Sequence, residues 1–342
     1  MNVILLSKNM QTYKSGAYHQ DIVNSFIKHT NSYIYGPGYK DYNRNDNIED
    51  VIKKSSFDIN NLNLIVCTTS WDDDESLINV DPHSNIDLSN IKNIKKIYFL
   101  NKEYKKLDLK FKYIKKQNFD LVCTVLQKAN NWSRELGIKF LNVPFGVSLE
   151  NFKDMKLKRK YDFAFTGSLH KNHLDKRFKV KNILFKVNKM GLKTNKGLSN
   201  FFNLNPLNKT YQKKNIFWAE WGAKSLFLNS LLPSGDKYVK LLNQSKVFLN
   251  TTSAMDIFNT RFFELMATKT MILCPESDKY LGILRDKYNC LMYRNDMSNF
   301  EEIFFKSIDD VFFRKQIVSN AFNDVQFHSY DHRIKSLLEM LN

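Results

Sequence analysis

The chain has 342 residues, of which 43% are hydrophobic, 14% aromatic and 25% charged. These proportions support packed cores and exclude a disordered chain, and the length is sufficient for two domains. Lysine and arginine number 52 against 35 aspartate and glutamate, which gives a formal net charge of +17. Such a surplus indicates either a polyanionic partner or a Lys- and Asn-rich composition without functional meaning, and the sequence leaves both interpretations open.

The cysteine content favours a reducing compartment. The four cysteines include no Cys-x-x-Cys pair, and three of them lie in apolar runs, as buried thiols do. The first ten residues, MNVILLSKNM, contain an apolar stretch too short for a signal peptide, and no segment reaches the roughly 18 apolar residues of a membrane span. We therefore expect a cytoplasmic protein.

The N-terminal half alternates short β-rich runs with amphipathic helical patterns. We expect strands at residues 2–6, 32–36, 62–70, 94–100, 119–125 and 139–147, and helices at residues 16–29 and 128–138. This alternation, with strands apolar on both faces, predicts βαβ units and a parallel sheet. Residues 1–150 are therefore expected to form a Rossmann-like domain.

A polar, basic linker is expected at residues 148–160, after which the alternation resumes. We expect strands at residues 161–168, 246–252 and 270–274, and helices at 175–190, 235–245, 260–269, 299–308, 309–322 and 330–341. Residues 194–235 show no clear pattern and are expected to be irregular. The predicted fold class is α/β, with a second Rossmann-like domain over 158–325, a closing helix over 326–342, and the two domains facing across a cleft.

The helix expected after the strand at 246–252 carries a charged pair near its start. Arg261 and Glu264 lie one turn apart, and Thr260 is placed to cap the helix. The free N–H groups and the positive end of the dipole suit a diphosphate there, while Glu264 could accept hydrogen bonds from ribose hydroxyls and Arg261 could bind phosphate. An ordinary surface ion pair is the competing interpretation.

Residues 253–277, SAMDIFNTRFFELMATKTMILCPES, resemble the donor-binding motif of GT-B glycosyltransferases, which have two Rossmann-like domains. Asp256 and Glu264 match the spacing of the two acidic residues of that motif. Arginine before the aromatic residue and glutamate resembles the spore-maturation (CgeB-like) branch of the group 1 glycosyltransferases. Residues 161–168, 143–152 and 328–341 resemble that family's glycine loop, interdomain exit and closing helix. Two departures are Asp256, where the family has Glu, and Lys269 or Thr270, where it usually has Gly.

The resemblance implies a glycosyltransferase that moves a sugar from a nucleotide-sugar donor to a glycan or lipid-linked acceptor, in surface polysaccharide or glycoconjugate synthesis. It implies no cofactor besides the donor substrate, and metal-independent chemistry. A glycine after a strand and a downstream arginine also suit a pyrophosphate in their own right. The expected donor-binding residues are Gly167, Ser168, Arg177, Asn259, Thr260, Arg261 and Glu264.

The acceptor is expected in the N-terminal domain, at the start of its first helix. Gly16 permits a tight turn there, and Gly16 and Gln20 are candidate acceptor-binding residues. His19 is the candidate catalytic base, because an imidazole has a pKa suited to proton transfer. A solvated helix histidine is the plainer alternative.

Two polar segments invite a metal interpretation that we do not favour. His170 and His173 have no obvious acidic or cysteine partner, and residues 72–74, three aspartates, read as a solvated loop. No metal site is therefore expected.

Residues 91–116 hold ten lysines interleaved with aromatics. This segment could form a basic face that contacts anionic lipid at the inner membrane surface, or a plain solvated face. Nucleic acid is not expected as a partner, since no recognised binding motif is present. Two rival functions stay open: a non-catalytic basic module that binds nucleic acid or another polyanion, and a related transferase of a polyol phosphate.

Overall fold

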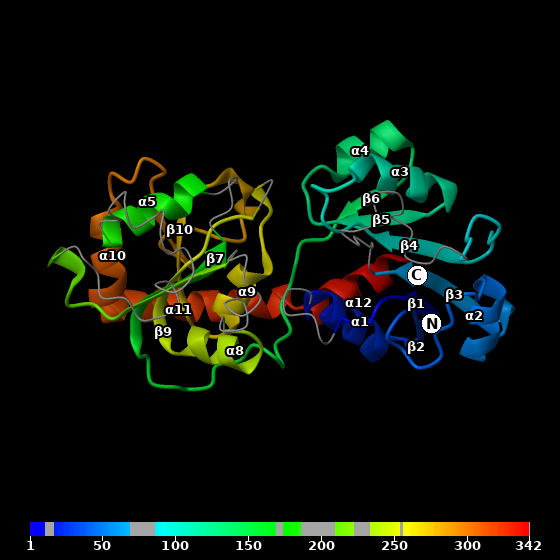
Figure 1. The fold of residues 1–342 in the computed structure, drawn as a ribbon, viewed down its shortest axis with the longest axis horizontal. Coiled ribbons are helices and arrows are strands. Elements are labelled where there is room, and N and C mark those ends of the chain that lie inside the picture. Colours follow the sequence, from blue (N-terminus) through cyan, green and yellow to red (C-terminus); the bar gives the residue numbers. More distant parts are fainter. Residues whose placement is uncertain are drawn as a thin grey trace. The chain divides into compact units, whose positions relative to one another are not determined.

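The computed structural model describes residues 1–10, 17–68, 86–168, 174–185, 209–221, 233–253 and 256–341. Gly16, the aspartates at 72–74, His170 and His173 lie outside this part of the chain. The chain divides into two compact units, the first comprising Met1–Ser148 and Tyr330–Asn342, and the second Leu149–Ser329 (Figure 1). Among the helices described, none is long and apolar enough to cross a membrane.

The first unit is built on a six-stranded parallel sheet in the order β2-β1-β3-β4-β5-β6. Its strands are β1 (Asn2–Leu6), β2 (Asn31–Tyr35), β3 (Leu62–Cys67), β4 (Lys95–Phe99), β5 (Leu121–Thr124) and β6 (Phe140–Asn142). Its helices are α1 (Ala17–His29), α2 (Ile48–Ser55), α3 (Leu107–Lys116), α4 (Ala129–Leu136) and α12 (Tyr330–Leu341), with a short 3-10 turn, η1 (Ile59–Asn61).

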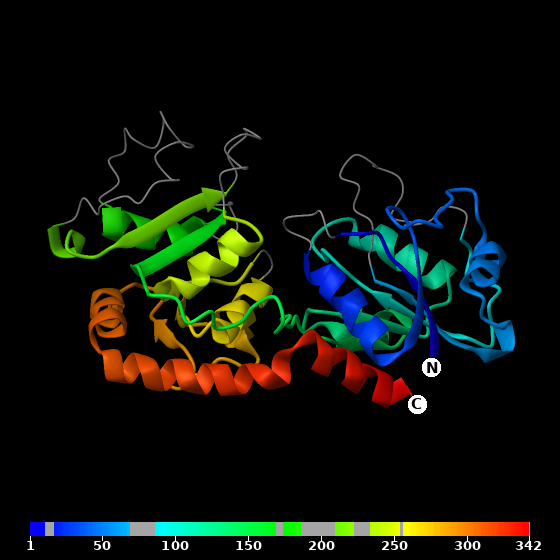
Figure 2. The ribbon, with the colours of Figure 1, turned by 90° about the horizontal axis from the view of Figure 1, so that it is seen from below.

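Helix α12, from the end of the chain, packs beside α1 on one face of this sheet (Figures 1 and 2). Val3 and Val66 of the sheet, Phe26 of α1 and Leu337 of α12 belong to one buried cluster. Burial of these apolar side chains is the main force holding α12 to the first unit, although α12 follows the whole second unit in sequence.

The second unit has a five-stranded parallel sheet in the order β11-β10-β9-β7-β8. Its strands are β7 (Tyr161–Ser168), β8 (Ile216–Trp221), β9 (Ser245–Leu249), β10 (Met271–Pro275) and β11 (Leu291–Tyr293). Its helices are α5 (Leu174–Phe185), α8 (Asp236–Asn243), α9 (Thr260–Ala267), α10 (Phe300–Asp309) and α11 (Val311–Val325), with 3-10 turns η3 (Lys209–Tyr211), η5 (Asp278–Tyr280) and η6 (Gln326–His328).

The expected fold class, α/β with two Rossmann-like sheets and C-terminal helices, is confirmed. One expectation is wrong: residues 194–235 are not irregular throughout, because β8 lies within them. β8 pairs with β7, and Trp218 packs on Phe165 with ring centroids 4.2 Å apart. This aromatic contact places an edge strand where the sequence shows no alternating pattern.

Both sheets reverse their strand order beside their first strand. In the first unit, β1 lies between β2 and β3, and in the second unit, β7 lies between β8 and β9. Such a reversal leaves a crevice beyond the carboxyl ends of the strands, and ligands of open α/β sheets bind there. Ligand sites are therefore expected at the carboxyl ends of β1 and β3 in the first unit, and of β7 and β9 in the second.

The segment expected as a linker contains no helix or strand, and all of it after Ser148 belongs to the second unit. Its Arg159 fixes it to the unit: one terminal nitrogen donates to the Leu242 and Ser245 carbonyls and to Thr270 Oγ1, and the other to the Thr268 and Lys269 carbonyls, at 2.7–3.1 Å. Only the planar fork of an arginine satisfies so many acceptors at once.

Candidate functional site

Arg177 occupies the crevice of the second unit, between the ends of β7 and β9. Its Nε donates to Thr251 Oγ1 at 2.8 Å, and Nη1 donates to the Ser168 carbonyl. The side chain is buried, with 5% of the residue exposed. Gly167 allows this approach, because a Cβ on it would lie 2.9 Å from the Phe165 ring and 3.2 Å from Arg177 Nη1.

Arg261, in the first turn of α9, reaches the same strand end. Its Nη1 donates to the Thr166 carbonyl at 2.5 Å, and its Nε donates to Tyr238 Oη at 2.9 Å. Burial, together with the nearby positive charge of Arg261, lowers the pKa of Arg177 to about 9. No carboxylate pairs with Arg177 within the described part of the chain. Two guanidinium groups held this close, one of them without a counter-ion among the described residues, are chemically suited to an anion.

Glu264 lies one turn further along α9 and is linked to Arg261 through Tyr238 of α8. Tyr238 Oη donates to Glu264 Oε2 at 2.8 Å while it accepts from Arg261. Burial raises the pKa of Glu264, and Arg261, Tyr238 and Thr260 oppose that rise. Arg261 and Glu264 therefore do not form a direct surface ion pair. They are linked by a hydrogen-bonded chain through Tyr238.

The start of α9 differs from the expectation that Thr260 caps it. Asn259 is the N-cap residue and Thr260 is the first helical residue, and no side chain makes a capping hydrogen bond there. Asn259 instead donates from Nδ2 to the Thr251 carbonyl at 2.7 Å and accepts from Asn250 Nδ2 at 3.0 Å. The first N–H groups of α9 are thereby left available to an anion.

Within the described part of the chain, two buried polar atoms in this crevice have no hydrogen-bond partner. They are Thr166 Oγ1 and Asn250 Oδ1, on residues that are each 1% exposed. Buried polar groups are normally satisfied, so an unsatisfied pair at a strand end is a typical sign of a ligand site. Asp256 lies at the rim: it is exposed, accepts from Thr252 Oγ1 at 2.9 Å and pairs with Lys176 at 3.4 Å.

The structure thus brings the predicted donor residues Gly167, Ser168, Arg177, Asn259, Thr260, Arg261 and Glu264 to the crevice between β7 and β9 or to the first turns of α9 beside it. Sequence reasoning missed Tyr238 and Thr251, which hold the two arginines. Neither position belongs to a motif, so no sequence signal distinguishes them.

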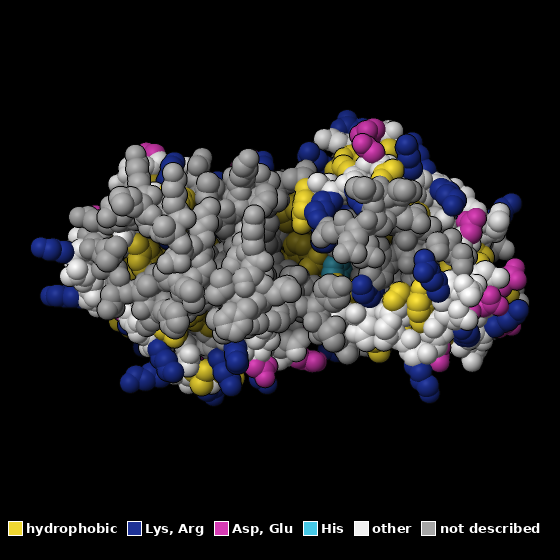
Figure 3. Space-filling model, viewed as in Figure 1, with side chains coloured by type: hydrophobic (Ala, Val, Ile, Leu, Met, Phe, Trp, Pro, Cys, Tyr) yellow, Lys and Arg dark blue, Asp and Glu magenta, His cyan; other side chains and the backbone are white. Residues whose placement is uncertain are grey.

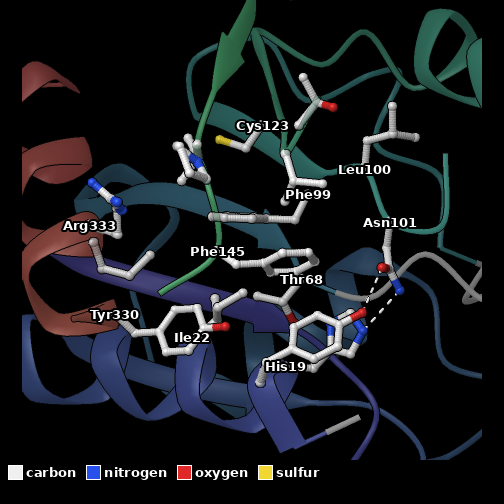
Figure 4. A pocket seen from close by; sticks show the side chains of 16 residues that line it. His19, Ile22, Thr68, Phe99, Leu100, Asn101, Cys123, Phe145, Tyr330 and Arg333 are labelled. Atoms are coloured by element: carbon white, nitrogen blue, oxygen red, sulfur yellow. Dashed lines mark hydrogen bonds between the residues drawn. The ribbon is translucent and has the colours of Figure 1, made fainter. Parts of the chain in front are cut away.

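A pocket lies at the carboxyl edge of the first unit's sheet, with about 480 Å³ of empty space that includes open solvent (Figure 4). Phe99, Val143 and Phe145 contribute apolar surface, and Ile334 of α12 also lines the pocket. His19, the candidate base, lines this pocket and is 5% exposed. It is therefore not a solvated surface histidine.

His19 belongs to a short hydrogen-bonded chain. Tyr18 Oη donates to Asn101 Oδ1 at 2.8 Å, and Asn101 Nδ2 lies 2.9 Å from His19 Nε2 (Figure 4). Because the amide oxygen of Asn101 accepts from Tyr18, its nitrogen donates to Nε2, and the imidazole proton lies on Nδ1. Burial lowers the pKa of His19 to about 4, so His19 is neutral at pH 7 and a weak base.

Gln20, the other candidate acceptor residue within the described chain, is tied to its neighbours. Its Nε2 donates to Asn24 Oδ1 at 3.2 Å, and its Oε1 accepts from Tyr39 Oη at 3.4 Å. It does not line the pocket. Any acceptor role for Gln20 stays a prediction.

The lysine-rich segment at 91–116 is not wholly a surface feature. Lys110 is fully buried and donates to the Asn101 carbonyl at 2.7 Å, and Lys96 is 4% exposed and donates to the Leu88 and Gln117 carbonyls. On the face shown in Figure 3, the described Lys and Arg side chains are scattered among acidic and apolar ones. Two of the ten lysines therefore serve the fold of the first unit.

The sequence and the structure were compared with those of known proteins. Residues 202–339 match the model of a family described as glycosyl transferase-like. A glycosyltransferase from Rickettsia africae has a similar structure, with a TM-score of 0.59 and 12% identity, over 99% of this chain and 97% of that one. Sucrose-phosphate synthase from Thermosynechococcus elongatus gives 0.58 and 10%, over 100% and 99%. HepE from Anabaena, solved in complex with UDP-glucose, gives 0.56 and 10%, also over 100% and 99%.

No match was found among curated proteins. The structural likeness confirms the GT-B glycosyltransferase fold expected from the sequence. Assignment to the CgeB-like branch stays a prediction.

Proposed function

We propose that this chain is a glycosyltransferase whose nucleotide-sugar donor binds in the crevice between β7 and β9. The observation that carries the proposal is the pair Arg177 and Arg261, two guanidinium groups anchored on one strand end, with no carboxylate on Arg177 within the described residues. Such a pair suits a diphosphate, which carries negative charge on adjacent groups.

The rest of the crevice fits the other parts of a nucleoside diphosphate. The uncapped start of α9 adds N–H donors toward the phosphates. Glu264 uses one oxygen to accept from Tyr238, and a carboxylate has further acceptor capacity for ribose hydroxyls. The complex of HepE with UDP-glucose supports this class of donor.

In this proposal the arginines act on the leaving group. As the bond between the sugar and the diphosphate breaks, negative charge grows on the diphosphate, and preorganised donors stabilise that charge. We further propose that the acceptor, a glycan or lipid-linked molecule of surface polysaccharide or glycoconjugate synthesis, binds in the first unit. Contact of the remaining exposed lysines with anionic lipid belongs to the same proposal.

The test is a calorimetric titration of UDP, GDP, CDP, ADP and dTDP into the wild-type protein, Arg177→Met and Lys179→Met. Both variants remove one positive charge from α5, but Lys179 is exposed. We expect one nucleotide to bind the wild type and Lys179→Met equally, and Arg177→Met about 30-fold more weakly, since a hydrogen bond to a charged group contributes about 2 kcal/mol. Equal losses of nucleotide affinity in both variants would contradict the proposal. So would a wild-type protein that binds no nucleotide but binds heparin in a salt-sensitive way, a result that favours a basic polyanion-binding module.

A further inference from the structure

We propose that the pocket of the first unit selects an acceptor with an apolar body, an aryl or alkyl alcohol, whose hydroxyl group bonds to His19 and Thr68. The pocket's role as acceptor site rests on the function proposed above. The nature of the bound molecule rests on the pocket alone.

The walls of the pocket are mainly apolar. Phe99 and Phe145 lie in its middle, Ile22 and Ile334 come from the two packed helices, and Val143 follows β6 (Figure 4). The ring of Phe145 meets that of Tyr18 edge-on, with centroids 5.0 Å apart. Such surfaces gain from covering apolar groups, whereas a free sugar needs hydrogen-bonding groups along its length.

Two polar residues, His19 and Thr68, lie at one end of the pocket, beside the crevice between β1 and β3, whereas Arg333 and Tyr330 of α12 line its other side (Figure 4). Thr68 follows β3 directly, and His19 lies in the first turn of α1. Two of their atoms, His19 Nδ1 and Thr68 Oγ1, are buried without a hydrogen-bond partner in the described structure. The Thr68 main chain is near enough to raise the pKa of His19 against the effect of burial, but no hydrogen bond of normal geometry reaches Nδ1.

These two atoms match one hydroxyl group. The bond from Asn101 to Nε2 leaves Nδ1 as a donor, so Nδ1–H can donate to a hydroxyl oxygen while Thr68 Oγ1 accepts the hydroxyl hydrogen. Thr68 is 0% exposed, so an unmatched hydroxyl there is unfavourable, and a ligand that supplies the missing bonds is preferred. His19 is then a residue that orients the acceptor.

Transfer of the sugar to this alcohol needs only the donor and the alcohol as reactants. The alcohol oxygen forms the bond to the anomeric carbon, the bond between that carbon and the diphosphate breaks, and the hydroxyl proton is released to water. With its low pKa, His19 stays neutral through this step.

The experiment is an NMR titration of the full chain with 4-methylphenol, with toluene, which lacks the hydroxyl, and with glucose. Wild type is compared with Thr68→Val, which keeps the shape but loses Oγ1, and with Thr30→Val, a matched control outside the pocket. We expect 4-methylphenol to bind wild type and Thr30→Val alike, and Thr68→Val about fivefold to tenfold more weakly, the effect of one hydrogen bond. Toluene binding should be the same in all three proteins.

A second readout does not depend on the variants. In the wild type, the ¹⁵N resonances of His19 should show the Nδ1–H form, and 4-methylphenol should shift Nδ1. The inference would be overturned if glucose bound in the pocket and 4-methylphenol did not. It would also be overturned if 4-methylphenol bound without shifting the His19 Nδ1 resonance and with the same affinity for wild type and Thr68→Val.

UDP and the other nucleotides are titrated in the same samples, which separates the two proposals. Nucleotide binding without 4-methylphenol binding overturns this inference and leaves the proposed function standing. Binding of 4-methylphenol at His19 without any nucleotide supports the pocket's ligand class and overturns the proposed function.

Discussion

Arg177 and Arg261 donate hydrogen bonds to two carbonyls on the same strand end, those of Ser168 and Thr166. The arginines come from different helices, α5 and α9, which follow β7 and β9. Their convergence is a consequence of the parallel sheet, in which each strand's carboxyl end feeds a helix at the same edge. This geometry concentrates positive charge where the sheet order reverses.

The fork of Arg177, and not only its charge, should matter for the donor. Arg177→Lys keeps the charge but cannot bond to Thr251 and Ser168 and still reach a phosphate. We expect nucleotide affinity to fall about tenfold, measured by calorimetry. The reverse change at the exposed Lys179, Lys179→Arg, is the control and should leave the affinity unchanged; an unaffected Arg177→Lys would show that charge alone suffices.

Glu264 should affect ribose binding and not phosphate binding. Glu264→Gln keeps the size of the side chain but turns one acceptor oxygen into a donor. We expect about tenfold weaker binding of the nucleoside diphosphate, with inorganic pyrophosphate binding within twofold of wild type. Comparable losses for both ligands would mean that the change acts through Arg261 and Tyr238 instead.

The burial of His19 should appear in the pH dependence of stability. Its pKa is lowered from 6.5 to about 4, so the folded chain binds fewer protons than the unfolded chain between these values. The stabilisation is therefore complete above pH 6.5 and is lost as the pH falls toward 4, by about 3 kcal/mol. Urea unfolding of wild type and His19→Gln at pH 7, 5.5 and 4 measures it; a constant difference between the two proteins would contradict the low pKa.

Lys269 adopts a backbone conformation that glycine favours, at a position where the glycosyltransferase motif usually has glycine. It has φ +52°, a left-handed conformation, and the bonds from Lys269 N to Met266 O (3.2 Å) and Thr270 N to Leu265 O (2.9 Å) form a Schellman end to α9. Glycine favours this conformation, whereas lysine retains it with an ion pair to Asp154 at 3.3 Å.

We expect Lys269→Gly to be about 1 kcal/mol more stable than Lys269→Ala, because both lose the ion pair but only glycine relieves the backbone. Thermal unfolding measures the difference. Equal stability of the two variants would indicate that the left-handed backbone carries no cost at this position.

Strands buried on both faces could be predicted well from the sequence. Residues 2–6 and 161–168 are strands with the expected bounds, since a short, continuous apolar run between polar residues leaves few other structures. The three-residue strand β11 and helix α2 were not predicted. For α2 a signal existed: Asn47 and Asp50 form a capping box, with hydrogen bonds of 3.0 and 3.1 Å.

Site residues could be predicted from the sequence only where they lie close together along the chain. Arg261 and Glu264 share a helical turn, but their link through Tyr238 is set by the packing of α8. Likewise, Asn101 meets His19 from 82 positions away. The buried Lys110 was misread as part of a basic face, because its carbonyl partners are brought together only by the folded chain.

The most direct test of the central claim is hydrogen exchange, read by mass spectrometry, with and without the nucleoside diphosphate that binds most tightly. We expect slower exchange in peptides covering the carboxyl ends of β7 and β9 and the first turn of α9, and no such slowing in Arg177→Met. Slowing confined to the first unit, or none with any of the five nucleotides, would contradict a donor site between β7 and β9.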